Sequence, residues 1–157
     1  MPDTVRQLVR NDLVTTLTNA ALANYLEPHV SLFADEPGER THGWPAFFVH
    51  AVDDRPVADE DNMIGFTTRR ARFALECWDR VSDDAPPRAS VADNVEVLLG
   101  RVIVALCVDP QRGDLALDTT IGNATFLLIV REQRLAGVEL EVTCVYRHLF
   151  GQPFAPA

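Results

Sequence analysis

Apolar side chains recur with the period of an α-helix in two stretches of the chain. The first stretch predicts a helix over residues 3–26, which Asp3 can cap and Pro28 ends. Ser90 is the predicted cap of the second helix, which proline disrupts at Asp109-Pro110. The apolar sides comprise Val5, Leu8, Val9, Leu13, Leu17, Ala20, Ala21 and Leu22 in the first helix and Val91, Val95, Leu98, Leu99, Val102, Ile103 and Leu106 in the second.

Other segments have the composition or the period of β-strands. In residues 69–80 alternate side chains are apolar, which is typical of a half-buried strand. Further strands are predicted at residues 30–33, 45–52, 124–132 and 137–148. The order α-β-β-β-α-β-β predicts an α+β fold: a mostly antiparallel sheet of about five strands with two long helices packed on one face. We expect residues 1–157 to form a single domain.

Two segments fall outside this pattern. Residues 53–68 contain five acids and one arginine, so we expect an extended acidic loop outside the subunit core that orders against a neighbouring subunit. Its residues 59–62 lack the ligand spacing of an EF-hand, which argues against a metal site. Residues 149–157 form a predicted C-terminal tail that includes Leu149, Phe150 and Phe154. These side chains either fold back over their own sheet or dock on an adjacent subunit.

The charge of the chain narrows the possible functions. Asp and Glu total 23 against 14 basic residues, all of them arginine, and the net charge is −9. Such a chain repels phosphate, which argues against a nucleic-acid grip over most of its surface. No apolar run approaches the ~18–20 residues of a membrane span, and the charged N-terminus does not resemble a secretion signal, so we expect a protein used without export.

Residues 105–118, ALCVDPQRGDLALD, combine a cysteine, an Arg-Gly-Asp triplet and further aspartates. The triplet at residues 112–114 could mimic an integrin ligand, but a match of three residues is weak evidence. Asp109-Pro110 disfavours helical geometry and Gly113 supplies the freedom that a turn needs. We therefore interpret this segment as a helix stop.

The cysteines and histidines do not form a recognisable site. Cys77, Cys107 and Cys144 are far apart in apolar runs, which favours buried free thiols over disulfides or zinc ligands. The histidines are scattered; they are His29, His42, His50 and His148. A Cys144–His50 nucleophile pair stays possible on spacing alone, although packing in the core is the simpler role for Cys144. We predict no catalytic, cofactor-binding or metal-binding residues.

The C-terminal third of the chain has the most specific pattern. A long amphipathic helix breaks at residues 108–110, a glycine turn and two strands follow, the last at residues 139–147, and Gly151-Gln152-Pro153 comes after them. This arrangement resembles the tail terminator (tail completion, minor tail) proteins of long-tailed bacteriophages and related tail-like particles. The opening helix with residues 5–8 and the proline-led strand at residues 45–49 agree more loosely.

One departure concerns the turn after the helix. It reads Gln111-Arg112-Gly113 here, where that family often has leucine-glycine-glycine. Neighbouring head–tail connector and neck proteins of similar size therefore stay as alternatives. From a different class, a small α+β ligand-binding domain or an enzyme is the other alternative.

The resemblance implies a structural protein and not an enzyme. Such proteins form a hexameric ring that caps the tail tube, ends its polymerisation and offers the surface to which the head attaches. The implied partners are further copies of the chain, the major tail tube protein and a head–tail connector or neck protein, with no cofactor and no membrane. Genomic DNA would pass through the ring without specific binding, past an acidic wall. The implied location is the virion, assembled in the host cytoplasm.

Overall fold

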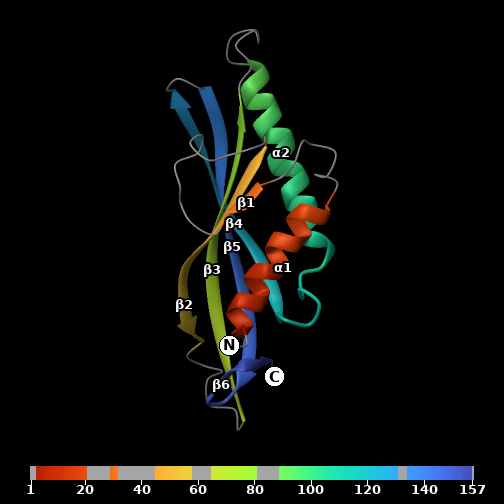
Figure 1. Cartoon of the computed structure of the whole chain (residues 1–157), viewed down its shortest axis with the longest axis vertical. Coiled ribbons are helices and arrows are strands. Elements are labelled where there is room, and N and C mark those ends of the chain that lie inside the picture. Colours follow the sequence, from red (N-terminus) through yellow and green to blue (C-terminus); the bar gives the residue numbers. More distant parts are fainter. Residues whose placement is uncertain are drawn as a thin grey trace.

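The fold is a mixed sheet with two helices on one of its faces (Figure 1). The computed structural model describes residues 3–20, 29–31, 45–57, 65–80, 89–130 and 134–156. The strand order is β1-β2-β3-β5-β4, with β6 beside β5, and the α+β prediction is thus confirmed. The elements are α1 (Val5–Asn19), β1 (His29–Ser31), β2 (Ala46–Pro56), β3 (Phe66–Arg80), α2 (Ala89–Val108), β4 (Asp118–Val130), β5 (Arg134–Leu149) and β6 (Gln152–Pro156).

The central pair of the sheet is the antiparallel ladder of β3 and β5. It runs without a register shift from Phe66 opposite Leu149 to Arg80 opposite Leu135. β2 and β4 pair antiparallel with the outer sides of this ladder, and β1 alone is parallel to its neighbour. These two long strands follow the long axis of the molecule in Figure 1.

The main core lies between the helices and the sheet face that they cover, called here the inner face. The predicted alternation in β3 is confirmed, because every second side chain from residue 71 to 77 is buried there. α1 and α2 each contribute a buried stripe at helical spacing. The stripes are Val5, Val9, Leu13 and Leu17 in α1 and Val95, Leu98, Val102 and Leu106 in α2.

The opposite, outer face of the sheet has a second, smaller apolar cluster. Phe48 and Trp78 are buried there together with Ala46 and Leu135. An added Cβ on Gly137 would lie 2.5 Å from Cε3 of Trp78, so only glycine lets the indole lie this close to β5. The alternation of residues 69–80 assigns Trp78 to the polar side of β3. The indole is on that side, but it is buried.

The helix ends differ from the prediction. Thr4 caps α1 in place of Asp3, because its hydroxyl accepts from the Gln7 amide at 3.2 Å and the Gln7 side chain accepts from the Thr4 amide at 2.7 Å. Ala20 is extended, so a single helix to residue 26 is wrong; residues 21–28 lie outside the described part. α2 begins at Ala89, two residues too early for Ser90 to cap it.

The predicted acidic loop at residues 53–68 is wrong at both ends. β2 continues to Pro56 and β3 begins at Phe66, so residues 53–56 and 66–68 belong to two paired strands. Residues 58–64 lie outside the described part. A β-bulge between Ala51 and Asp53 shifts the register within β2. Asp53 and Asp54 fit in a strand because Arg72 and Arg69 of β3 neutralise them.

The C-terminal tail is also more ordered than predicted. β5 continues to Leu149, and Gly151, with a φ of 71°, turns the chain back. β6 then pairs with the end of β5, through His148 opposite Pro156 and Leu149 opposite Gln152. The prediction that pairing ends near His148 is therefore wrong, because a glycine turn permits a new antiparallel strand.

Arg112 is fully buried where the two helices meet the sheet. Its Nη2 donates to the carbonyl oxygen of Leu106 in the last turn of α2, and its Nε donates to the Thr119 hydroxyl of β4 at 3.2 Å. Its Nη1 lies 3.5 Å from the Thr16 hydroxyl and 3.8 Å from Asp12 Oδ2, both in α1. One side chain thus ties α1, α2 and β4 together.

We expect Arg112→Ala to lower the free energy of unfolding by on the order of 3 kcal/mol, because the buried polar groups that it serves lose their donors. Urea unfolding followed by circular dichroism measures this. Arg6→Ala, at an exposed position of α1, is the control and should change the free energy by less than about 0.5 kcal/mol. Equal losses in the two variants would contradict the role of Arg112.

Candidate functional site

The turn after α2 is a structural feature and presents no Arg-Gly-Asp ligand. The Asp109 carboxylate accepts from the amides of Gln111 at 3.0 Å and Gly113 at 2.7 Å. Arg112, Gly113 and Asp114 all have positive φ values of 53°, 62° and 67°. This left-handed run ends the helix and directs the Arg112 side chain inward. The helix-stop interpretation is confirmed, and the integrin alternative is excluded because Arg112 is buried.

The structure separates the cysteine and histidine that spacing alone could have paired. Cys144 is opposite Ala71 and lies in the inner-face core, whereas His50 is opposite Ala74, whose side chain points to the outer face. A Cys144–His50 nucleophile pair is therefore excluded. Burial raises the pKa of Cys144 and outweighs the contact with Thr119 that lowers it, which keeps the thiol protonated and unreactive.

The three thiols do not share one environment. Cys77 and Cys144 are buried, as predicted, and burial raises the pKa of both. Cys107 is exposed, so its prediction as a core residue is wrong. It lies at the margin of the apolar side of α2, where Ile103 is only partly buried, and the helix turns its side chain to the surface.

Where β2 and β3 leave the helix layer, the bulge divides two aspartates between the two faces. Asp54 faces inward, where Arg69 Nε donates to its Oδ1 at 3.0 Å and the Tyr146 hydroxyl donates to its Oδ2 at 2.8 Å. Asp53 faces outward and accepts from Arg72 Nε at 3.0 Å, which lowers the pKa of Asp53. Asp53 and Asp54, two of the five acids predicted to be solvated, are thus part of the sheet, and the other three lie outside the described residues.

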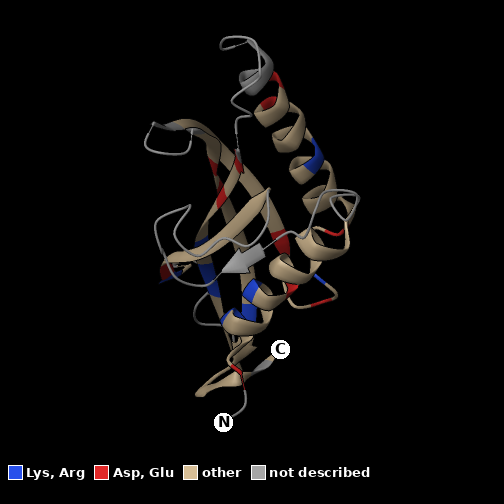
Figure 2. Cartoon of the chain, turned by 45° about the horizontal axis from the view of Figure 1, so that its top comes forward, with Lys and Arg blue, Asp and Glu red and all other residues tan. Residues whose placement is uncertain are grey.

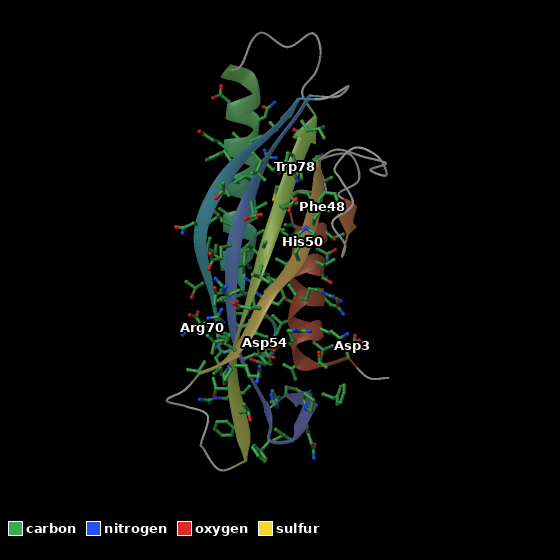
Figure 3. All side chains as sticks on the ribbon, turned by 90° about the vertical axis from the view of Figure 1, so that its left-hand side faces the viewer. Asp3, Phe48, His50, Asp54, Arg70 and Trp78 are labelled. Atoms are coloured by element: carbon green, nitrogen blue, oxygen red, sulfur yellow. The ribbon has the colours of Figure 1, made fainter. Side chains whose placement is uncertain are left out.

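His50 and Glu76 form an acid–base pair on the outer face, and both residue types are common in catalytic sites. His50 Nε2 lies 3.5 Å from Glu76 Oε1, and Glu76 Oε2 also accepts from the Trp78 indole at 2.9 Å. The Phe48 ring stacks parallel to His50, with centroids 6.3 Å apart (Figure 3). These neighbours contain no nucleophile. Among the described residues, no group of three or more His, Cys, Asp or Glu could hold a metal ion.

Large apolar side chains are exposed at the end of the sheet where β6 lies. Phe150 is 76% exposed, Phe154 46% and Leu149 39%. Removing such side chains from water would be favourable. Phe66 stands opposite Leu149 in the ladder, and the guanidinium of Arg147 lies 4.6 Å above the centre of its ring.

Arginines lie on the outer face of the strands that lead to this end of the sheet. Arg55 stands directly opposite Arg70, and a pair of like charges in this position is unfavourable. The side chain of Arg55 is 74% exposed, and Arg70 is exposed and forms no ion pair with any residue that the structure describes. We call the set of Arg55, Arg70, Arg147, Leu149, Phe150 and Phe154 the arginine–phenylalanine end. Figure 2 shows arginines of the strands and of α1 toward this end of the molecule.

This end is the candidate functional site, because arginine and aromatic residues are enriched where proteins contact one another. The three apolar residues were already predicted to dock or to fold back, and the backbone does fold back while the side chains stay exposed. The sequence pattern does not predict the arginines of this end. The facing of Arg55 and Arg70 depends on the register after the bulge, which alternation alone cannot supply.

Comparison of the sequence with protein-family models and with curated proteins found no match. In the described part of the chain, no helix has the length and apolar character needed to cross a membrane.

A thiol reagent should modify one cysteine per native chain. We expect Cys107 to react at neutral pH because it is exposed, and Cys77 and Cys144 to react only on unfolding. Mass spectrometry after a timed pulse of the reagent measures this. Cys107→Ser should abolish native labelling, and rapid labelling of Cys144 would contradict its burial.

Tyr146 should make the stability of the protein sensitive to alkaline pH. Burial and then its hydrogen bond to Asp54 raise the pKa of Tyr146 above the ordinary value of 10.0. The unfolded chain releases this proton first, so the contribution is complete below pH 10 and declines as pH rises above it. The absence of lysine leaves few other groups to titrate in this window.

The free energy of unfolding of the wild type should therefore fall more steeply above pH 10 than that of Tyr146→Phe. Urea unfolding at a series of pH values measures both. Parallel curves for the two proteins would show that Tyr146 is not perturbed.

Proposed function

We propose that this chain is a structural virion protein: a tail terminator that forms a ring, expected to be hexameric, on the end of the tail tube. In this role it ends tube polymerisation and provides the surface to which the head or neck attaches. Its partners are further copies of itself, the major tail tube protein and a connector or neck protein. Genomic DNA passes through the ring without specific binding.

The observation that carries this proposal is the arginine–phenylalanine end. A domain of this size has a large core between helices and sheet, yet it leaves Phe150, Phe154 and Leu149 on the surface of an ordered hairpin. Exposed apolar groups gathered at one place, with arginines on the adjoining strands, favour an assembly protein over a self-sufficient monomer.

The order of the C-terminal elements supports the same proposal. The resemblance depended on a long helix, a break at residues 108–110, a glycine turn, two strands and a final Gly-Pro segment. In the structure these are α2, the turn at residues 109–114, β4, β5 and β6. The departure from the family at Arg112 also has a structural role, since this arginine ties the turn to both helices.

The test is to remove the exposed aromatic groups without altering the core. Phe150→Ser/Phe154→Ser should keep the circular dichroism spectrum and the unfolding midpoint, because both side chains are on the surface. In a complementation assay with phage that lack the wild-type gene product, the variant should yield at least tenfold fewer complete particles and leave uncapped tails. Electron microscopy of the lysates measures this.

Val52→Ser is the matched control, because Val52 is 55% exposed on β2 and away from the hairpin. It should yield wild-type numbers of particles. A normal particle yield from Phe150→Ser/Phe154→Ser would contradict the proposed role of this end. Normal, capped tails in phage that lack this chain altogether would contradict the proposed function itself.

A further inference from the structure

We propose that copies of this chain join head to tail, with the arginine–phenylalanine end of one copy on the exposed side of α2 in the next. The occupant of each surface is thus a second copy of the chain. The inference rests on the ring proposed above and names the two surfaces that would form its repeating contact.

The receiving surface is an exposed apolar stripe on α2. Val97, Val104 and Val108 are 51%, 66% and 80% exposed. They stand at intervals of seven and four residues, so they lie on one side of the helix, away from its buried stripe. We call these three residues the α2 valine face. Gly100 is exposed, and a Cβ added there would meet nothing within 4 Å, so the backbone is open to a close neighbour.

Acids flank the α2 valine face at both ends. Asp93 and Glu96 lie before it and Asp109 and Asp114 after it, and all four are exposed. Arg101 is the one exposed arginine of residues 93–114, because Arg112 is buried. Arg101 lies on this same side of the helix, four residues after Val97 and three before Val104, so the face has one cation among its valines and four acids at its margins.

The arginine–phenylalanine end has the complementary composition. Its apolar residues lie on the hairpin of β5 and β6, and its arginines lie on the outer face of β2, β3 and β5. Arg70 is opposite Val145, four residues along the ladder from Leu149. Of its charges, Arg55 is paired with Asp53 at 3.2 Å, whereas Arg70 has no ion pair with any described residue. Docking this end on the α2 valine face would cover apolar groups on both copies and bring Arg70 to a carboxylate.

The two surfaces lie on different parts of the molecule. α2 borders the upper half of Figure 1 and the hairpin of β6 its lower end. One copy cannot satisfy both surfaces itself, and a contact between unlike surfaces leaves each dimer with one free surface of each kind. Such a contact is heterologous and closes into a ring when the rotation between copies divides a full turn. A two-fold dimer would instead use one surface twice.

The test uses two variants, each blocked at one surface. Arg70→Glu/Phe150→Ser blocks the arginine–phenylalanine end, and Val104→Glu blocks the α2 valine face. In low salt, wild-type protein should self-associate with rising concentration in sedimentation velocity, and each variant alone should associate at least tenfold more weakly. An equal mixture should form one-to-one heterodimers and nothing larger, because only one intact surface of each kind is left.

Val52→Glu is the matched control and should assemble like the wild type, since Val52 is equally exposed but outside both surfaces. Added salt should weaken assembly of the wild type and of the mixture alike. Any of three outcomes would overturn the inference: the wild type stays monomeric, either blocked variant associates as strongly as the wild type, or the mixture stays monomeric. The particle assay on phage that lack this chain altogether does not depend on these two surfaces, so its result tests the proposed function separately from this inference.

Discussion

The arrangement of the helix layer depends on the buried guanidinium of Arg112. It donates to the carbonyl end of α2, where the helix dipole is negative, and it approaches Asp12 and Thr16 of α1. A buried charge is costly unless its donors are used, so these contacts strongly favour one relative position of the two helices. The left-handed turn held by Asp109 is what directs the side chain inward.

A second constraint is the bulge in β2, which exchanges the faces of the residues that follow it. Before the bulge, Val49 packs in the core; after it, Asp53 points outward and Asp54 inward. The inward carboxylate is tolerated because Arg69 and Tyr146 both donate to it. The same shift places Arg55 opposite Arg70 on the outer face, so the bulge determines the charge of the candidate site.

Periodicity alone predicted the fold class, both helices and the buried side of β3, because these depend on the regular alternation of apolar residues. Periodicity and composition gave the wrong prediction where a side chain contacts a residue that is distant in the sequence. Asp53 and Asp54 are typical of a loop by composition, yet ion pairs with Arg72 and Arg69 keep them in a strand. Cys107 has an apolar neighbourhood in the sequence, but one residue of helical rotation beyond Leu106 exposes it. Neither outcome can be predicted without knowing which elements are neighbours.

The distribution of arginine argues for a protein partner rather than nucleic acid. Binding to a phosphate backbone strengthens with the number of phosphates neutralised, so it needs many free cations in a row. Here Arg69 and Arg72 are already paired with aspartates and Arg112 is buried in the core. Of the arginines nearer the hairpin, Arg55 is paired with Asp53 and Arg147 lies over the Phe66 ring, on a chain with a net charge of −9. A surface that is both apolar and locally basic, on an acidic chain, matches the acidic and apolar surface of another protein, and a further copy of the same chain provides one.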